Sequence, residues 1–507
     1  MGTIKFGWAE SQFVFPKPVS LAGQFAVRFS QYEEKPLTAT ALAVESGVQQ
    51  MVLCSVDLVG ISDRLVQEVR DRLAKDPCGL SPESVILCAT HIHTGPRYAS
   101  YGVTQTDAYG KGNCWSGQRM ILRQLLPEGK QFVERVTAAN NDAIMSEAAV
   151  LEELAAKIAD AVIRAWKGRN DGAFSNAFGR VPVGQCRRVC FRDGTAQMWG
   201  DVTSPDFTEL EGGNDSGVEL LYIFNKEEKL TGIVANLACP AQCVQHRMFI
   251  SPDFWGEAKM LLRRHFGEDI FLLPLCSAAG DQCPADMVRF VEPESDLNDP
   301  NLIRNNPPKR EAGPSMFDLS GMRKVGKRIA NEIIAVYEEE LTEKKAETEF
   351  THLVRKVALP LRSVTEAEVA WAKDSLASYI AAKDGDFDFH DQANLQAQLG
   401  ILQREELQAA MDVIQIEMHI ARLGPVAFAT NPFELFLNYG NQMKAGSPAQ
   451  QTFVVELANG FDGYLPTEKA EKGGHYSGFH ASGCVGHAGG EELVRQTLLD
   501  IRRLFSE

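Results

Sequence analysis

Apolar and polar residues alternate between strand-like and helix-like periods in the first third of the chain. Short β-rich runs at 38–47 and 49–60 precede an amphipathic helical stretch at 62–76. The stretch 81–96 is expected to form another strand that runs into a loop. A helix is expected from Glu147 to Lys167, where Ala, Leu and Ile recur at helical spacing. This β-α-β pattern predicts an α/β fold.

The rest of the chain continues the alternation. Strands are expected within 220–240, as two strands joined by a turn, within 270–284, and in a hairpin over 411–434 with its turn at Leu423-Gly424. Helices are expected at 256–267, 318–345, 366–410 and 490–505. No internal repeat or clear linker interrupts the sequence. We therefore predict one large mixed α/β catalytic domain over residues 1–507, with central β-sheets flanked by helices.

Two stretches depart from this alternation. Residues 287–315 are rich in Asp, Asn, Glu, Pro and Arg and predict a long loop, because they are too polar to form a core. This predicted loop directly follows a segment that is expected to contribute to the functional site. Two interpretations are left open, a lid over that site and a surface insertion. The sequence KDGDFDFH at 383–390 interrupts the later helical region, which favours a helical hairpin over about 364–412.

The charge balance narrows the class of partner. The chain has 51 basic and 67 acidic residues, a formal net charge of −16. This charge argues against a nucleic-acid partner and against an anionic membrane surface. A small-molecule substrate fits better, and self-association into a homo-oligomer is left open.

The sequence features that bear on cellular compartment predict a cytoplasmic location. The N-terminus has no charged segment followed by an apolar stretch, so we expect no secretory signal, and no apolar run is long enough to predict a membrane span. The 11 cysteines run from Cys54 to Cys484 without the spacing of a disulfide framework. That distribution is typical of a reducing compartment, and most of these thiols are expected to fill the core.

The sequence CATHIHTGPR at 88–97 carries two histidines at a predicted strand end. Side chains one residue apart in an extended segment lie on the same face, so His91 and His93 can point into one cavity. Sites in α/β sheets gather at the carboxyl ends of strands. The pair predicts either a metal and proton-transfer site or a hydrogen-bonded loop pair.

Several motifs, in order, resemble those of the neutral/alkaline ceramidases, which are zinc-dependent amidases. The match begins with His91-Ile92-His93-Thr94-Gly95-Pro96. It continues with GDQCP at 280–284, PFE at 432–434 and GYLPT at 463–467, with Tyr476 standing 12 residues after Tyr464. The resemblance covers the chain from about residue 10 to its end, so it implies the catalytic domain of that family. The family's C-terminal β-sandwich domain is expected to be absent.

The resemblance implies a zinc ion (Zn²⁺) held by His91, Glu434 and Tyr464. The family's fourth ligand is a histidine 14 residues before an Asp, and counting back from Asp253 reaches Cys239. A thiolate is a good zinc ligand, so the site can survive with Cys239 as its fourth ligand. The alternative is that the metal is lost and Cys239 only packs.

Cys283 is a second departure, because the family's loop has a serine there. A thiol near zinc and arginine is a candidate nucleophile, but an inert packing role is equally open. Arg187 resembles the family's substrate-binding arginine, although Cys186 replaces the preceding Asn, and Arg188 is an alternative substrate-binding residue.

Further side chains complete the predicted site. The resemblance implies that His93 and Tyr476 lie beside the scissile carbonyl as donors that stabilise the oxyanion. Asp57 and Asp281 are candidates to orient ligand imidazoles, with Asp281 also a candidate substrate contact, and a structural cap is equally open for both.

The leading hypothesis is a zinc hydrolase that cleaves an amide bond of a small substrate, either ceramide or a soluble compound, through a metal-activated water. One alternative is a hydrolase in which Cys283 attacks an ester, thioester or glycosidic bond. Another is a non-catalytic binding protein on a degenerate ceramidase scaffold, which the replacement of the ligand histidine favours.

Overall fold

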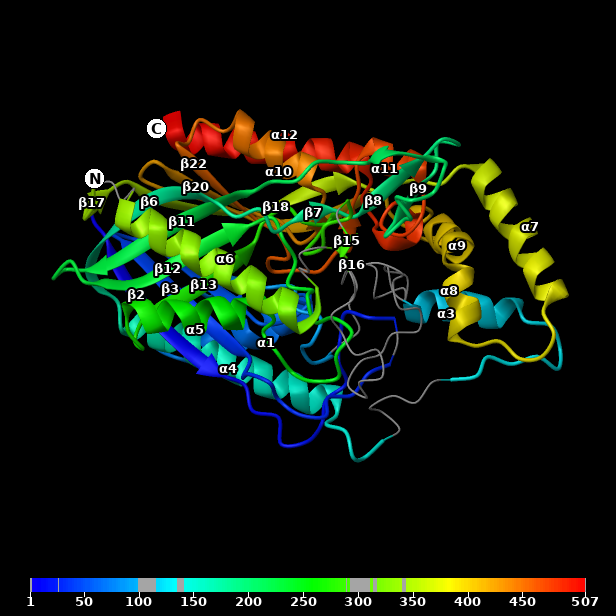
Figure 1. The fold of residues 1–507 in the computed structure, drawn as a ribbon, viewed down its shortest axis with the longest axis horizontal. Helices are drawn as coiled ribbons and strands as arrows, with labels where there is room; N and C mark the ends of the chain where they lie inside the picture. The colour runs from blue at the N-terminus through cyan, green and yellow to red at the C-terminus, as the bar shows by residue number, and fades with distance from the viewer. Residues whose placement is uncertain are drawn as a thin grey trace.

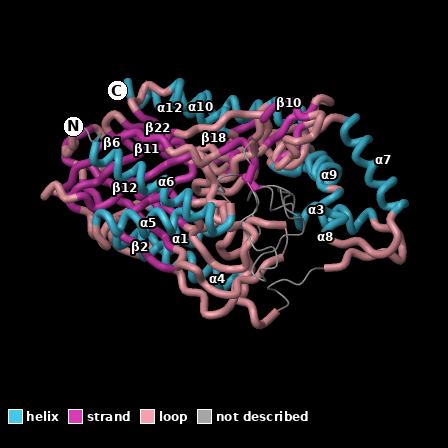
Figure 2. The backbone as a smooth tube through the Cα atoms, viewed as in Figure 1, coloured by secondary structure: helices cyan, strands magenta, loops and turns pink. Residues whose placement is uncertain are grey.

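The computed structural model describes residues 2–25, 27–98, 115–134, 141–288, 290–291, 311–312, 317–339 and 343–506. Helices, a large sheet, a smaller sheet and further helices are stacked as four layers (Figure 1). The strands lie between the two helical layers in the backbone trace as well (Figure 2). The α/β class expected from the sequence is confirmed.

The larger sheet has eight strands in the order β13-β12-β11-β6-β2-β3-β4-β5. They are β2 (Lys5–Gln12), β3 (Thr38–Ser46), β4 (Gln49–Val56), β5 (Val85–Ala89), β6 (Asn170–Arg180), β11 (Gly217–Asn225), β12 (Leu230–Leu237) and β13 (Phe271–Cys276). β4 pairs with β5, and β12 with β13, in parallel, whereas the other neighbours are antiparallel. The sheet is therefore mixed.

The smaller sheet packs on the inner face of the larger one. Its order is β18 (Phe350–Pro360), β19 (Val413–Leu423), β20 (Val426–Thr430) and β22 (Gln451–Val455), and only the last pair is parallel. Leu42 and Leu273 of the larger sheet share one buried cluster with Phe428 and Phe453 of the smaller sheet. The alternation of apolar residues in these strands accounts for this packing, because each sheet must bury one face against the other.

Helices cover the two outer faces. The outer face of the larger sheet packs on α1 (Asp63–Leu73), α4 (Glu147–Lys167), α5 (Phe254–Phe266) and α6 (Asp318–Glu339). The smaller sheet packs on α10 (Leu437–Gly446) and α12 (His487–Ser506). Ser62 and Ser146 begin α1 and α4 as predicted for helix caps, since each side-chain oxygen accepts a hydrogen bond from a backbone N–H of the first turn.

A helical group lies at one end of the molecule (Figure 1). It comprises α3 (Trp115–Leu125), α7 (Glu366–Ala382), α8 (Phe389–Asn394) and α9 (Gln396–Gln408). Thr365 and Glu368 form a capping box that begins α7, and Asp388 and Asp391 form one that begins α8. The polar sequence at 383–390 therefore ends one helix and starts the next.

The remaining elements are short. They are β1 (Gly2–Thr3), β7 (Gln185–Cys186), β8 (Arg188–Phe191), β9 (Ala196–Met198), β10 (Phe207–Leu210), β14 (Gln282–Cys283), β15 (Phe290–Val291), β16 (Glu311–Ala312), β17 (Glu347–Thr348), β21 (Glu434–Leu435), β23 (Tyr464–Leu465), α11 (Glu468–Gly473) and the 3₁₀ turns Pro82–Ser84 and His480–Ser482. Most of the predicted lid at 287–315 lies outside the described residues. Within the described ranges, no helix is both long enough and apolar enough to span a membrane.

Candidate active site

The candidate residues gather where strands of both sheets end. His91 and His93 follow β5, Cys239 follows β12, and Cys283 lies in the loop after β13. Glu434 and Tyr464 are directly opposite each other in the parallel pair β21 and β23. Partners in such a register carry their side chains as neighbours, and the short ladder thus brings together two residues 30 positions apart.

His91 has its ring fixed from one side only. Its Nδ1 lies 2.6 Å from the carbonyl oxygen of Val59, so Nδ1–H donates and the lone pair is left on Nε2. That Nε2 lies 3.4 Å from Glu434 Oε2. His91 also adopts a φ of 60°, a strained backbone conformation of the kind that clusters at functional sites.

His93 presents its ring to the same point. Its Nε2 lies 3.4 Å from His91 Nε2 and 3.0 Å from the side-chain nitrogen of Gln242. Burial, followed by the neighbouring His91, lowers the pKa of His93 well below its ordinary value, so the imidazole is neutral at neutral pH. Gly23 packs against this ring, and any side chain there would collide, since a Cβ would lie 2.4 Å from His93 Cγ.

Arg187 places a buried positive charge beside these groups. Its guanidinium donates to the side-chain oxygen of Gln242 at 3.1 Å, to the carbonyl of Gly280 at 3.1 Å and to the hydroxyl of Tyr464 at 3.4 Å. Its Nε has no hydrogen-bond partner, and in the described ranges no carboxylate lies within ion-pair distance of it. A buried arginine without a carboxylate partner is suited to receive negative charge from a bound molecule.

Tyr476 closes the site from another side. Its ring centroid lies 5.3 Å from that of Tyr464 and 5.3 Å from that of Phe25. Burial raises the pKa of Tyr476 to about 12 and that of Tyr464 well above its ordinary value. Both phenols therefore keep their protons at neutral pH and can donate hydrogen bonds.

A zinc ion is compatible with part of this donor set. Ligand atoms about 2.1 Å from zinc lie roughly 3.4 Å apart in a tetrahedral site. The separation of His91 Nε2 and Glu434 Oε2 matches that spacing, and the Val59 carbonyl supplies the partner that a metal-bound imidazole usually has. The spacing of His91 and Glu434 therefore fits two ligands of one zinc ion, while the ligand role of Tyr464 stays a prediction.

Cys239 is not brought to these three residues. Its thiol points to the carbonyl of Pro240 at 3.7 Å, and the described ranges contain no hydrogen bond or ion pair from it to His91, Glu434 or Tyr464. Nor does any group of three or more His, Cys, Asp and Glu side chains in the described part of the chain have the arrangement of a metal site. The ligand role of Cys239 stays a prediction.

Cys283 is fully buried and donates to the carbonyl of Ala285 at 3.3 Å. Burial raises the pKa of its thiol to about 12, although Arg187 opposes that shift. A nucleophilic cysteine needs a lowered pKa, because the thiolate is the reactive species. This environment is typical of an inert, protonated thiol.

The two aspartates hold loops. Asp281 accepts a hydrogen bond from the backbone N–H of Leu437 at 2.9 Å, which connects the loop after β13 to the start of α10. Asp57 accepts from the backbone N–H and the hydroxyl of Thr38 at 2.8 and 2.9 Å. Neither carboxylate is hydrogen-bonded to an imidazole in the described residues, so the capping interpretation is favoured for both.

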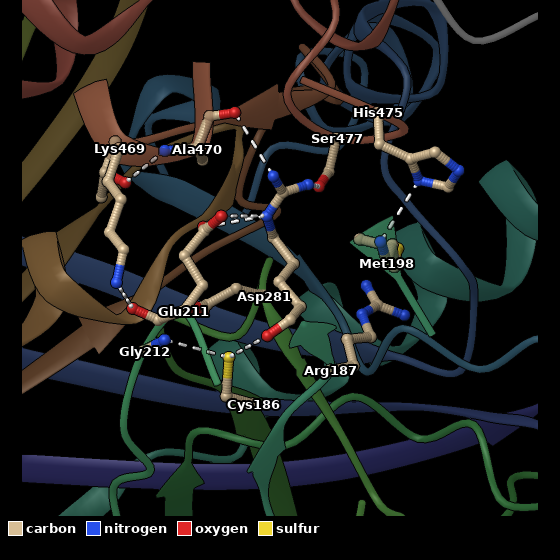
Figure 3. A network of polar contacts seen from close by, with 12 residues as sticks. Cys186, Arg187, Met198, Glu211, Gly212, Asp281, Lys469, Ala470, His475 and Ser477 are labelled. Atoms are coloured by element: carbon tan, nitrogen blue, oxygen red, sulfur yellow. Dashed lines mark hydrogen bonds and ion pairs between the residues drawn. The ribbon is translucent and has the colours of Figure 1, made fainter. Parts of the chain in front are cut away.

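Arg188 has a different environment from Arg187. Its side chain is fully buried and pairs with Glu211, at 2.8 and 2.9 Å from Nε to the two carboxylate oxygens (Figure 3). Its other nitrogens donate to Tyr476, Ser477, Gly474 and Ala470. All three guanidinium nitrogens are thus used by the protein, which favours a positioning role over substrate binding.

Sequence reasoning missed several residues of the site. Gln242 contacts both His93 and Arg187, and Gln24 reaches His93 Nδ1 at 3.4 Å. Glu456 accepts hydrogen bonds from the backbone N–H groups of Ala279 and Leu435, which holds the loops that carry Asp281 and Glu434. Only Gln242 had a usable signal, because it lies three residues after Cys239 in a loop already predicted to form the site.

Gly280 explains how two of these loops approach each other. A Cβ there would lie 2.3 Å from the carbonyl oxygen of Glu434, and the N–H of Gly280 donates to the carbonyl of Leu435 at 2.8 Å. Any larger residue would push the loop away from Glu434. The glycine of the GDQCP motif thus has a structural reason to be a glycine.

No protein-family model and no curated protein matches this chain. Solved structures match its fold. Neutral ceramidase from Pseudomonas aeruginosa superposes with a TM-score of 0.64 at 17% identity, over 99% of this chain and 75% of that chain. A ceramidase complexed with C2 gives a TM-score of 0.63 at 15% identity, over 98% and 74%. The chain therefore has a ceramidase-like fold, as its motifs predicted.

Proposed function

We propose that the protein is a zinc-dependent hydrolase that cleaves an amide bond of a small N-acyl substrate. The observation that carries this proposal is the approach of His91 Nε2 to Glu434 Oε2, with the opposite ring nitrogen held by the Val59 carbonyl. A lone pair directed at a carboxylate oxygen is unfavourable unless a proton or a cation lies between them. A proton on Nε2 or a bound cation satisfies this contact, and the 3.4 Å spacing of the two atoms, which matches that of two ligands on one zinc ion, supports the metal.

His91, Glu434 and Tyr464 would hold the zinc ion. The fourth position belongs either to Cys239, after rotation of its side chain, or to water, since catalytic zinc sites commonly keep one position open. When bound, zinc polarises a carbonyl group and lowers the pKa of a bound water to about 7.

Three groups would stabilise the tetrahedral intermediate. Tyr476 keeps its proton and can donate it in a hydrogen bond to the developing oxyanion, while Arg187 contributes a positive charge that has no ion-pair partner among the described residues. His93 is neutral and its Nε2 accepts a hydrogen bond from the Gln242 amide, whose oxygen accepts from Arg187, so His93 would contribute indirectly by orienting Gln242 and Arg187.

Two considerations support amide hydrolysis over attack by Cys283. Two solved structures that share the fold are ceramidases. The Cys283 thiol is buried and protonated, which does not favour a nucleophile. The net charge of −16 leaves soluble N-acyl amides as credible as ceramide.

Hydrolysis of two substrate classes by the purified protein tests this proposal. Short-chain N-acylsphingosine and a panel of soluble N-acyl amides are incubated with wild type, with His91→Ala and with His390→Ala, an exposed histidine of α8 that serves as the control. We expect at least one class to be cleaved by wild type and His390→Ala, and by His91→Ala at a rate lower by more than about 10²-fold. Cleavage that persists in His91→Ala, or after complete removal of metal, would contradict the proposal.

A further inference from the structure

The segment Ala470–Ser477, which carries Tyr476, is anchored by one guanidinium group from another part of the chain. Arg188 Nη1 donates to the carbonyl of Tyr476 at 2.9 Å and to the hydroxyl of Ser477 at 3.0 Å. Its Nη2 donates to the carbonyls of Gly474 at 2.9 Å and Ala470 at 3.3 Å. A single side chain thus collects four acceptors within eight residues, of which Ala470 and Ser477 are labelled in Figure 3.

The charge of Arg188 is neutralised locally. Both carboxylate oxygens of Glu211 accept from its Nε, and the side chains are 0% and 4% exposed. The single Nε–H is shared between the two oxygens, and the buried pair is hard to break, because removal of either partner leaves the other charge buried and unpaired. The ion pair with Glu211 therefore restricts the orientation of the Arg188 guanidinium independently of its contacts with the segment Ala470–Ser477.

The backbone on both sides of Tyr476 is strained. His475 and Ser477 have φ values of 64° and 70°, in the left-handed region that residues other than glycine rarely adopt. Such conformations are strained and persist only where surrounding contacts impose them. Arg188 supplies such contacts, and the ring of His475 adds one more by accepting the Met198 N–H at 3.2 Å (Figure 3).

The side chains of Arg187 and Arg188 contact different parts of the protein. Successive side chains in an extended segment point to opposite sides. Arg187 reaches Gln242 and Tyr464 inside the site, whereas Arg188 reaches the backbone of the loop that carries Tyr476. The orientation of this loop decides where the Tyr476 phenol lies relative to Tyr464.

We propose that Arg188, paired with Glu211, is a positioning residue that fixes Tyr476 in the site, so that loss of Arg188 acts on the reaction through Tyr476. This inference rests on the proposed function, because it takes Tyr476 as an oxyanion donor. Arg188 itself touches no reacting group.

A double-variant cycle tests the inference. The kcat for hydrolysis of a fluorogenic short-chain N-acylsphingosine is measured for wild type, Arg188→Met, Tyr476→Phe and the double variant. We expect each single variant to lower kcat by about 10²-fold, with KM little changed, and the double variant to be no slower than Tyr476→Phe alone. A further loss of similar size in the double variant would overturn the inference.

Two companion variants keep the test informative. Arg188→Lys keeps the charge beside Glu211 but cannot reach four acceptors, so an intermediate kcat is expected, and it replaces Arg188→Met in the cycle if that variant does not fold. Arg70→Met removes the part-buried ion pair with Glu417, remote from the loop, and should leave kcat unchanged. A loss in Arg70→Met equal to that in Arg188→Met would mean that kcat reports only general stability and would overturn the inference.

Amide hydrogen exchange separates this inference from the proposed function. Arg188→Met should speed exchange within 470–477 and leave the strands of both sheets unchanged. Unchanged exchange in that segment would overturn the anchoring role. If wild type cleaves no N-acyl amide, the proposed function fails, whereas faster exchange confined to this segment would still support the anchor.

Discussion

Among the described residues, two pairs of histidines are in contact, and they differ in the atoms that their ring nitrogens contact. His352 donates from Nδ1 to the carbonyl of Gln50 at 2.8 Å and meets His419 Nδ1 at 3.0 Å, while His419 Nε2 lies 2.8 Å from Glu417. The two rings are stacked, with an angle of 23° between them. In the pair formed by His91 and His93, the rings are at 73° and both Nε2 atoms converge near Glu434.

The difference teaches which histidines are available for chemistry. Each nitrogen of His352 and His419 has a partner within the protein, and Glu417 is in turn held by Arg70 in a bidentate ion pair. That pair connects the two sheets and offers nothing to a ligand. His91 has Nδ1 satisfied by Val59, whereas its Nε2 lies 3.4 Å from both Glu434 and His93, longer than an ordinary hydrogen bond and close to the spacing of two ligand atoms around one metal ion.

The largest expected effect separates the two pairs directly. His91→Ala should abolish bound zinc and lower kcat/KM by more than the roughly 10²–10³-fold that loss of one oxyanion donor costs. His352→Ala, the matched variant in the other pair, should keep zinc and near wild-type activity. Elemental analysis and steady-state kinetics on both variants test this difference. Equal loss of activity in the two variants would contradict the claim that only the pair His91 and His93 serves the reaction.

Loss of His93 should have a smaller effect. His93→Ala removes an oriented side chain but none of the three residues expected to hold zinc, so kcat should fall by about 10²-fold with the metal retained. The measurement is kcat with zinc content determined on the same preparation. Loss of zinc in His93→Ala would instead make His93 a ligand.

The His352→Ala substitution should lower the free energy of unfolding and leave the catalytic activity unchanged. Removal of the His352 ring takes away the partner of the buried His419 Nδ1 and one contact of the Gln50 carbonyl, which costs about 1–3 kcal/mol of the free energy of unfolding. Urea titration monitored by circular dichroism measures this loss. A free energy equal to that of wild type would show that the stacked pair adds nothing.

The stacked pair also predicts a pH dependence of stability. Burial, followed by His419, lowers the pKa of His352 from 6.5 to about 4. Between these values the unfolded chain binds a proton that the folded chain does not, so this contribution is full above pH 6.5 and is lost as the pH falls toward 4. His352→Gln should reduce the fall in the free energy of unfolding over this range, and an unchanged profile would contradict the expectation.

The smallest expected effect concerns the sulfur atoms of the site. Cys283→Ser keeps a donor for the Ala285 carbonyl, so activity should stay within about three-fold of wild type if the thiol is a spectator. Steady-state kinetics with the substrate that wild type cleaves measure this. A loss of about 10²-fold or more would restore the nucleophile hypothesis for Cys283.

The sequence predicted the part of the site that depends on local order. The strand before His91, the His-x-His spacing, and the turn around Gly280 and Asp281 are all short-range features, and the β-α-β pattern led to the correct fold class. The ceramidase-like fold followed from motifs that keep their order along the chain. These features could be predicted from the sequence because they are determined by residues that are close together along the chain.

Long-range features could not be predicted in this way. Gln24 and Gln242 meet at His93 from loops that are far apart in the sequence, and Glu456 joins two loops through backbone N–H groups. Counting from Asp253 gave the position of Cys239, but the direction of its thiol depends on packing around Pro240 and Gly184. Sequence spacing specifies position and leaves orientation to tertiary contacts.

The central claim is that His91, Glu434 and Tyr464 hold a zinc ion. Elemental analysis of protein purified without chelator, for wild type, Glu434→Gln and Cys239→Ala, tests it most directly. We expect about one zinc ion per chain in wild type and a sharp loss in Glu434→Gln, while Cys239→Ala reports whether the fourth ligand is sulfur or water. Active wild-type protein without zinc, or full zinc content in Glu434→Gln, would contradict the claim.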